Sequence, residues 1–216
     1  MYEAYVPVPN SILRGSWLHM MHFVVSLLSF VALGRSGRAQ SQARVLNKCP
    51  FPVYIRSVLG DEPLVQIVPP GEAYAETYRH LSAYNPAYGY NTSVGVSIKI
   101  VRGPEISSNM EEEKKMALFH QWGAVTQFEY TYDPSLGPDL PDLYYDISEI
   151  DDRSPRQFCQ WGYSIRPDSS SCEEVVCPAR CDSNCANVYN VWNDDHATRG
   201  CSSEVGLSLV LCEASA

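Results

Sequence analysis

The sequence predicts an all-β protein, either a β-sandwich or a barrel, and three observations support this prediction. Short runs of β-branched and aromatic residues recur along the chain, separated by proline, glycine or asparagine. Several runs alternate between apolar and polar residues, which is the period of a strand with one buried face. The chain has 216 residues, of which 45% are hydrophobic and 19% charged, and this composition suits a packed globular domain.

The predicted strands are short and regularly spaced, as in β-sandwiches and barrels. They are, in chain order, residues 43–49, 52–58, 64–68, 73–79, 94–101, 127–132, 143–147, 162–165 and 206–212. The clearest alternation lies in 94–101, where Val94, Val96, Ile98 and Ile100 fall on one face.

Two segments depart from this pattern. Residues 107–119 have a helical composition, with Glu and Lys three and four positions apart, and predict a solvated surface helix without chemistry of its own. Residues 172–189 contain cysteine-rich turns around Pro178 and predict a disulfide-stapled lobe with a short helix.

The N-terminal 39 residues predict an extension followed by a cleaved signal peptide. The apolar run 22–34 would cover only about 18 Å as a helix, less than the roughly 30 Å of a bilayer core. Gly37 and Ala39 have the small-residue spacing of a signal-peptidase site, so we expect cleavage after Ala39 and a mature domain of 40–216. A signal anchor is the alternative. After cleavage we expect no membrane span and a secreted protein.

All eight cysteines follow the predicted cleavage site, and an even number in an exported chain predicts four disulfides. Spacing alone leaves about 105 connectivities open. Cys177, Cys181 and Cys185 recur every four residues, so a metal or iron–sulfur site is an alternative, but no compact Cys/His spacing accompanies them. We therefore expect no metal and no cofactor.

Charge and modification signals narrow the class of protein further. The net charge of −9 argues against a nucleic-acid partner, because phosphate neutralisation needs a basic surface. Asn91-Thr92-Ser93 is an acceptor triplet for N-glycosylation and fits an exported chain. The nearby Tyr84, Tyr88 and Tyr90 lie in a predicted Pro/Gly/Asn loop, where they serve either sugar binding or no particular role.

Several segments, in this order along residues 43–212, resemble the thaumatin-like family, and in particular its short fungal branch, the Bys1-type (Blastomyces yeast-phase-specific, antigenic thaumatin-like) proteins. They are Cys49-Pro-Phe-Pro-Val-Tyr, Phe128-Glu-Tyr-Thr, Tyr145-Asp-Ile-Ser-Glu-Ile-Asp-Asp152, Cys172-x4-Cys177-Pro, Asp194-Asp-His-Ala-Thr-x-x-Cys201 and Leu207-Ser-Leu-Val-Leu-Cys212. Relative to the family, residues 103–123 resemble an insertion, and most of the cysteine-rich second lobe of the plant members is missing.

The resemblance implies a thaumatin-like flattened β-sandwich with a small disulfide-rich lobe, and a monomer is expected. It also implies the disulfides Cys49–Cys212, Cys172–Cys201 and Cys177–Cys185. Cys159 and Cys181 are then left, and we expect them to pair with each other.

The family's acidic cleft maps onto Glu129, Asp146, Asp151 and one of Asp194 or Asp195. Carboxylates accept hydrogen bonds from sugar hydroxyls, and two carboxyls in different environments can act as acid and base in glycoside hydrolysis. Asp146 and Asp151 are five positions apart, so the chain must bend for both to reach one cleft. The alternative is that these acids are merely solvated or bond turn amides. The family's arginine upstream of the glutamate has no counterpart in 120–128.

Three functions follow as hypotheses. The first is a secreted protein of the fungal cell wall or surface that binds β-glucan or a related carbohydrate through the acidic cleft without efficient catalysis. The second is a weak endo-β-1,3-glucanase, with Glu129 and Asp146 as candidate catalytic residues. The third is a non-catalytic structural or antigenic surface protein.

Overall fold

The computed structural model describes residues 41–60, 64–103, 109–121, 124–136, 139–152, 156–191 and 195–213. The predicted leader, residues 1–39, lies outside this part of the chain. Within the described residues, no helix is both long and apolar enough to cross a membrane.

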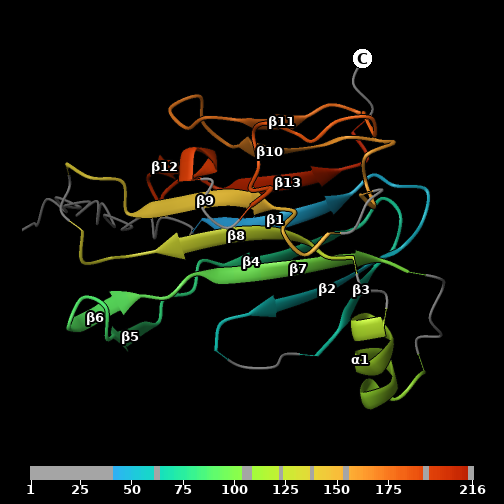
Figure 1. Cartoon of the computed structure of the whole chain (residues 1–216), viewed down its shortest axis with the longest axis horizontal. Coiled ribbons are helices and arrows are strands. Elements are labelled where there is room, and N and C mark those ends of the chain that lie inside the picture. The colour runs from blue at the N-terminus through green and yellow to red at the C-terminus, as the bar shows by residue number, and fades with distance from the viewer. Residues whose placement is uncertain are drawn as a thin grey trace, which may run out of the picture. The chain divides into compact units, whose positions relative to one another are not determined.

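The described residues from 41 onward form two large sheets, which can be followed in Figure 1. The five-stranded sheet has the order β11 (Val175–Cys177), β10 (Tyr163–Pro167), β13 (Leu207–Leu211), β1 (Gln42–Asn47) and β4 (Ala73–Thr77). The six-stranded sheet has the order β12 (Arg199–Cys201), β9 (Leu143–Ser148), β8 (Thr126–Tyr132), β7 (Val96–Arg102), β2 (Val53–Val58) and β3 (Gln66–Val68). A separate hairpin pairs β5 (Ser82–Asn85) with β6 (Tyr90–Ser93). The predicted all-β fold is confirmed.

The core lies between the two large sheets, and the alternating strands supply it. Ile98 and Ile100 of β7 and Phe128 of β8 are fully buried, and they join one cluster with Leu207 and Leu209 of β13. Burying an apolar side chain of this size stabilises the fold by about 1.5–3 kcal/mol. The predicted apolar face of 94–101 is therefore confirmed from Val96 onward, and its opposite face carries the polar Ser97 and Lys99.

The first and last strands of the domain lie side by side, because β1 pairs in parallel with β13. The Cys49–Cys212 disulfide joins the ends of these two strands. The other disulfides are Cys159–Cys181, Cys172–Cys201 and Cys177–Cys185. Three of these pairs are those that the sequence resemblance implies, and Cys159–Cys181 is the pair expected from the two remaining cysteines; all four are confirmed.

The insertion 103–123 contains helix α1 (Glu112–Gln121), which is not merely solvated. Phe119 is 2% exposed and packs in a small cluster with Tyr54 of β2 and Val101 of β7. Tyr54 and Val101 are cross-strand partners next to the core residues Ile55 and Ile100, so they lie on the outer face of the six-stranded sheet. The expectation of a solvated helix was wrong because the side of α1 that carries Phe119 covers this face.

Two further expectations differ from the structure. The predicted loop around Tyr84 and Tyr90 is the β5–β6 hairpin, since four cross-strand pairs join its two strands. The short helix expected within 172–189 is absent from these described residues, which form β11 and turns. A helix does not form here because two disulfides and Pro178 interrupt the segment.

Candidate functional site

The two strongest acidic candidates meet on the outer face of the six-stranded sheet. In the antiparallel ladder of β8 and β9, Glu129 is paired with Asp146, and on the other side Glu129 is paired with Ser97 of β7. Side chains directly opposite in such a ladder have Cβ atoms about 4.5–5.5 Å apart. Because Phe128 and Ile147 face the core, the strand alternation directs Glu129 and Asp146 outward.

The two carboxyl groups are coupled to each other. Burial, followed by the negative charge of Glu129 and a hydrogen bond with it, raises the pKa of Asp146 to about 8. Burial also raises the pKa of Glu129, against the opposing effects of Ser97 and Lys99. At neutral pH, Asp146 is therefore the protonated partner and donates a hydrogen bond to the Glu129 carboxylate. The site presents one neutral acid and one carboxylate side by side.

Asp151 joins this site through side chains of neighbouring strands. The strand β9 ends at Ser148, and the following turn returns Asp151 toward the same face. The Gln127 amide Nε2 lies 3.4 Å from Asp151 Oδ2, and Lys99 Nζ lies 3.8 Å from the same oxygen. Lys99 Nζ also donates to Gln127 Oε1 at 2.6 Å. The predicted bend between Asp146 and Asp151 is present.

A cavity of about 260 Å³ opens beside the carboxyl pair. It is lined by Gly95, Val96, Glu129, Tyr130, Thr131, Tyr144, Asp146 and Thr198. Within the described part of the chain, Asp146 Oδ1 is buried without a hydrogen-bond partner. This oxygen is closed to solvent, so within the pair it is the Glu129 carboxylate that a ligand in the cavity would contact.

Two acidic candidates remain, Asp194 and Asp195. Asp194 lies outside the described residues. Asp195 begins the short 3₁₀-helix η1 (Asp195–Ala197). Thr198, which directly follows η1, lines the cavity, so this segment borders the site. Asn91, the predicted glycosylation site, lies exposed on β6.

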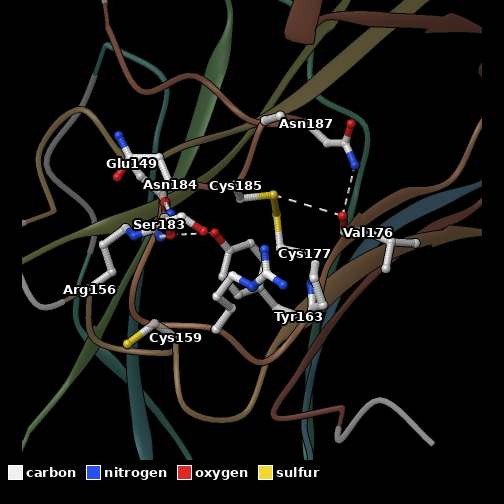
Figure 2. Close-up of a pocket in the computed structure, with 13 residues that line it drawn as sticks. Glu149, Arg156, Cys159, Tyr163, Val176, Cys177, Ser183, Asn184, Cys185 and Asn187 are labelled. Atoms are coloured by element: carbon white, nitrogen blue, oxygen red, sulfur yellow. Dashed lines mark hydrogen bonds and ion pairs between the residues drawn. A yellow bond between two sulfur atoms is a disulfide. The ribbon is translucent and has the colours of Figure 1, made fainter.

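A second cavity, of about 250 Å³, lies in the disulfide-rich lobe and is shown in Figure 2. Its wall contains the buried Glu149, which accepts hydrogen bonds from Arg156 and from the Tyr163 hydroxyl. Burial, reinforced by Glu149, raises the pKa of Tyr163 well above its ordinary value. Asn187 Nδ2 donates to the Val176 carbonyl at 2.9 Å. These groups bind one another, so this cavity is less suited to a ligand than the one beside Asp146.

The structure offers no alternative chemistry based on metal or thiol groups within the residues it describes. No group of three or more His, Cys, Asp or Glu there could hold a metal ion. All eight cysteines are in disulfides. Cys177, Cys181 and Cys185, the alternative metal ligands, have cysteine partners in the lobe.

Sequence reasoning missed the basic residue of the site. Lys99 on β7 supplies a positive charge beside Asp151 and Glu129. The sequence does place Lys99 on the polar face of its strand, because Ser97 and Lys99 alternate with the apolar residues of 94–101. What the sequence did not show is which strand pairs with β8.

Comparisons with known proteins agree with this architecture. The family model described as Blastomyces yeast-phase-specific protein (Bys1) matches residues 30–213. The chain is 31% identical over 200 residues to an antigenic thaumatin-like protein of Arthroderma benhamiae, covering 90% of this chain and 84% of the relative. It is 32% identical over 167 residues to the secreted thaumatin-like protein calA of Emericella nidulans, covering 77% and 78%.

Two solved structures are also similar. The protein elicitor MoHrip2 from Magnaporthe oryzae matches with a TM-score of 0.52 and 19% identity, covering 80% of this chain and 98% of that one. The thaumatin-like xylanase inhibitor TLXI matches with a TM-score of 0.46 and 13% identity, covering 79% and 98%. The likeness to MoHrip2 concerns the fold alone.

Proposed function

The chain belongs to the Bys1 family of thaumatin-like proteins, and from this premise we propose that it is an extracellular protein that binds a neutral cell-wall polysaccharide, such as β-glucan, without efficient turnover. Four disulfides and the relative described as secreted support the extracellular location. The binding surface in this proposal is the cavity beside Glu129 and Asp146.

The chemistry of the cavity supports a sugar as ligand. Each sugar hydroxyl both donates and accepts a hydrogen bond, so a site that recognises it needs both kinds of group. The carboxylate of Glu129 accepts hydrogen bonds, and the hydroxyls of Thr131 and Thr198 both donate and accept them. Tyr144 adds a ring with a polar end. The cavity lined by the adjacent Glu129 and Asp146 is the observation that carries the proposal.

The same carboxyl pair argues against efficient hydrolysis. Retaining glycosidases hold their two carboxyls about 5–5.5 Å apart, and inverting ones about 6.5–9.5 Å apart, with the reacting groups between them. Glu129 and Asp146 instead share a hydrogen bond. Two carboxyls that share a hydrogen bond are closer together than either arrangement requires, so we favour binding over catalysis.

Calorimetric titration with laminarin oligosaccharides tests the proposal. Glu129→Gln removes the carboxylate, and Asp146→Ala removes the unpartnered oxygen. A hydrogen bond to a charged group contributes about 1.5–3 kcal/mol and one to a neutral group about 0.5–1.5 kcal/mol. Glu129→Gln should therefore raise Kd about 10- to 150-fold, and Asp146→Ala about 2- to 13-fold. Asp182→Asn is the matched control, because its side chain is 82% exposed in the disulfide-rich lobe. Unchanged affinity in both site variants would reject the cavity as the binding surface.

Weak endo-β-1,3-glucanase activity is the second candidate function. One observation favours it, because the raised pKa of Asp146 gives an acid that stays protonated at neutral pH beside a carboxylate. Release of reducing ends from laminarin decides between the two functions. We expect no release above a heat-inactivated control. Release that Glu129→Gln abolishes would replace the binding proposal with catalysis.

A further inference from the structure

The β5–β6 hairpin displays three tyrosines that the site above does not use. Tyr84, Tyr88 and Tyr90 are 65%, 64% and 61% exposed. Tyrosine is an amphipathic side chain that is usually buried to a large extent, and clustered exposed apolar surface marks an interaction site more often than scattered residues do. In Figure 1 the hairpin lies beside the N-terminal end of β7.

The strand register divides these tyrosines between the two faces of the hairpin. Tyr84 is paired with Asn91, whereas Tyr90 is paired with Asn85. Directly paired residues share a face and successive residues alternate, so Tyr84 and Tyr90 lie on opposite faces. Tyr88, in the turn, lies next to Tyr90, with ring centroids 5.8 Å apart and an angle of 31° between the rings. Tyr88 and Tyr90 therefore form one aromatic platform, and Tyr84 lies on the face that carries Asn91, the predicted glycosylation site.

The hairpin lacks charge, which limits the kind of partner it suits. Residues 81–98 contain no Asp, Glu, Lys, Arg or His, in a chain with 25 acidic and 16 basic residues. A nucleic acid or an anionic membrane needs basic residues at the contact. Aromatic rings beside asparagine amides and serine or threonine hydroxyls instead match a neutral sugar, which has both apolar C–H faces and hydroxyl groups.

Backbone contacts hold the platform in place before any ligand arrives. The amides of Tyr88 and Gly89 donate to the Asn85 carbonyl at 3.2 and 2.9 Å, and the Asn85 side chain accepts from Ala87 N at 3.0 Å. Gly89 has a φ of +75°, which a residue with a side chain rarely adopts. At the base, Val94 N donates to the Leu81 carbonyl at 2.8 Å. A preorganised platform loses less conformational entropy on binding.

The hairpin continues directly into the wall of the acidic cavity. Gly95 and Val96, which line that cavity, follow the last hairpin residue, Ser93, by two and three positions. From Ser93 to Ser97, the partner of Glu129, the chain spans at most about 14 Å. A polymer long enough to occupy the cavity is therefore near the hairpin as well.

We propose that Tyr88 and Tyr90 form a second carbohydrate contact, which stacks on a neutral cell-wall glucan and adds avidity for the insoluble polymer. The inference rests on the proposed function in that it takes the same polysaccharide as its partner. Two linked contacts bind a long polymer more strongly than either alone, whereas a short oligosaccharide occupies only one. Loss of the platform should therefore weaken binding to the insoluble polymer and leave the Kd of a short oligosaccharide unchanged.

Sedimentation with curdlan particles and titration with a short laminarin oligosaccharide test this proposal, using three variants. We expect Tyr88→Ala/Tyr90→Ala to weaken curdlan binding tenfold or more and to leave the oligosaccharide Kd unchanged. Tyr84→Ala is the matched control, because its ring is equally exposed on the opposite face, and it should bind curdlan like the wild type. Glu129→Gln should weaken binding of the oligosaccharide. Thermal unfolding of the two tyrosine variants should match the wild type, since the three rings are exposed.

Three outcomes would overturn the inference. The double variant could bind curdlan as the wild type does, or Tyr84→Ala could reduce binding as much as the double variant. Sedimentation velocity could instead show a wild-type dimer that the double variant loses, which would make the platform a self-association surface. If Glu129→Gln changes nothing while the double variant still loses curdlan, the cavity proposal fails and the hairpin contact stands.

Discussion

Asp146 lies directly opposite Glu129 in the β8–β9 ladder, and its carboxyl group is hydrogen-bonded to that of Glu129. Two acids in this position would repel each other if both were ionised. Burial and the neighbouring charge keep Asp146 protonated at neutral pH, so the pair carries a single negative charge. The stability and chemistry of this face therefore depend on pH.

The first prediction concerns stability against pH. The pKa of Asp146 is about 8 in the fold, compared with 3.8 ordinarily, so the folded state binds the proton more tightly than the unfolded state. Stability then falls as pH rises from about 4 to about 8. Urea unfolding at pH 5 and pH 8 should show this decline for the wild type. Asp146→Asn, which imitates the protonated acid, should show a smaller decline. An equal decline in both proteins would contradict the assignment.

The second prediction concerns the buried ion pair of the lobe. Arg156 and Glu149 have side chains only 12% and 2% exposed. Arg156→Met leaves Glu149 buried without its cation, and breaking such a pair costs about 3–5 kcal/mol of unfolding free energy. Arg180→Met removes an arginine of the same lobe whose pair with Asp182 is exposed, and it should cost less than about 1 kcal/mol. Similar urea midpoints for the two variants would mean that the buried pair is not important for stability.

The third prediction concerns helix α1. Phe119→Ala removes the buried ring that packs on Tyr54 and Val101, and it should lower the unfolding free energy by about 3 kcal/mol. Glu113→Ala, at an exposed position of the same helix, should change it by less than about 0.5 kcal/mol. A Phe119→Ala variant as stable as the Glu113→Ala variant would indicate a solvated helix, as the sequence alone predicts.

The fourth prediction ranks two disulfides. Cys49 and Cys212 are 163 positions apart, whereas Cys177 and Cys185 are 8 apart. The loop-entropy relation assigns about 5 kcal/mol to the long crosslink and about 2.5 kcal/mol to the short one. Cys49→Ala/Cys212→Ala should therefore destabilise the protein about twice as much as Cys177→Ala/Cys185→Ala in guanidinium unfolding. The opposite order would show that local packing, and not loop length, determines the effect.

Most of the strand structure could be predicted, because alternation is a local signal. The runs 94–101 and 143–147 closely match β7 and β9, since each has one apolar face that the core requires. The hairpin was missed for the opposite reason. It has no apolar face, its tyrosines are divided between both sides, and Pro86 and Gly89 indicate a loop.

The candidate site was predictable only in part. Glu129 and Asp146 follow from the family resemblance and from strand alternation. The contribution of Lys99 depends on which strand lies next to β8, and the burial of Phe119 depends on where an inserted helix packs. Both are long-range relationships, and neither leaves a local pattern in the sequence.

The Cys49–Cys212 crosslink also determines what a protease can accomplish outside the cell. A single cut at any bond between these two cysteines leaves both fragments covalently attached. The nicked molecule would migrate as one band without reductant and as two bands after reduction. Degradation of this protein in a protease-rich environment therefore requires several cuts or a reducing agent before any large piece escapes.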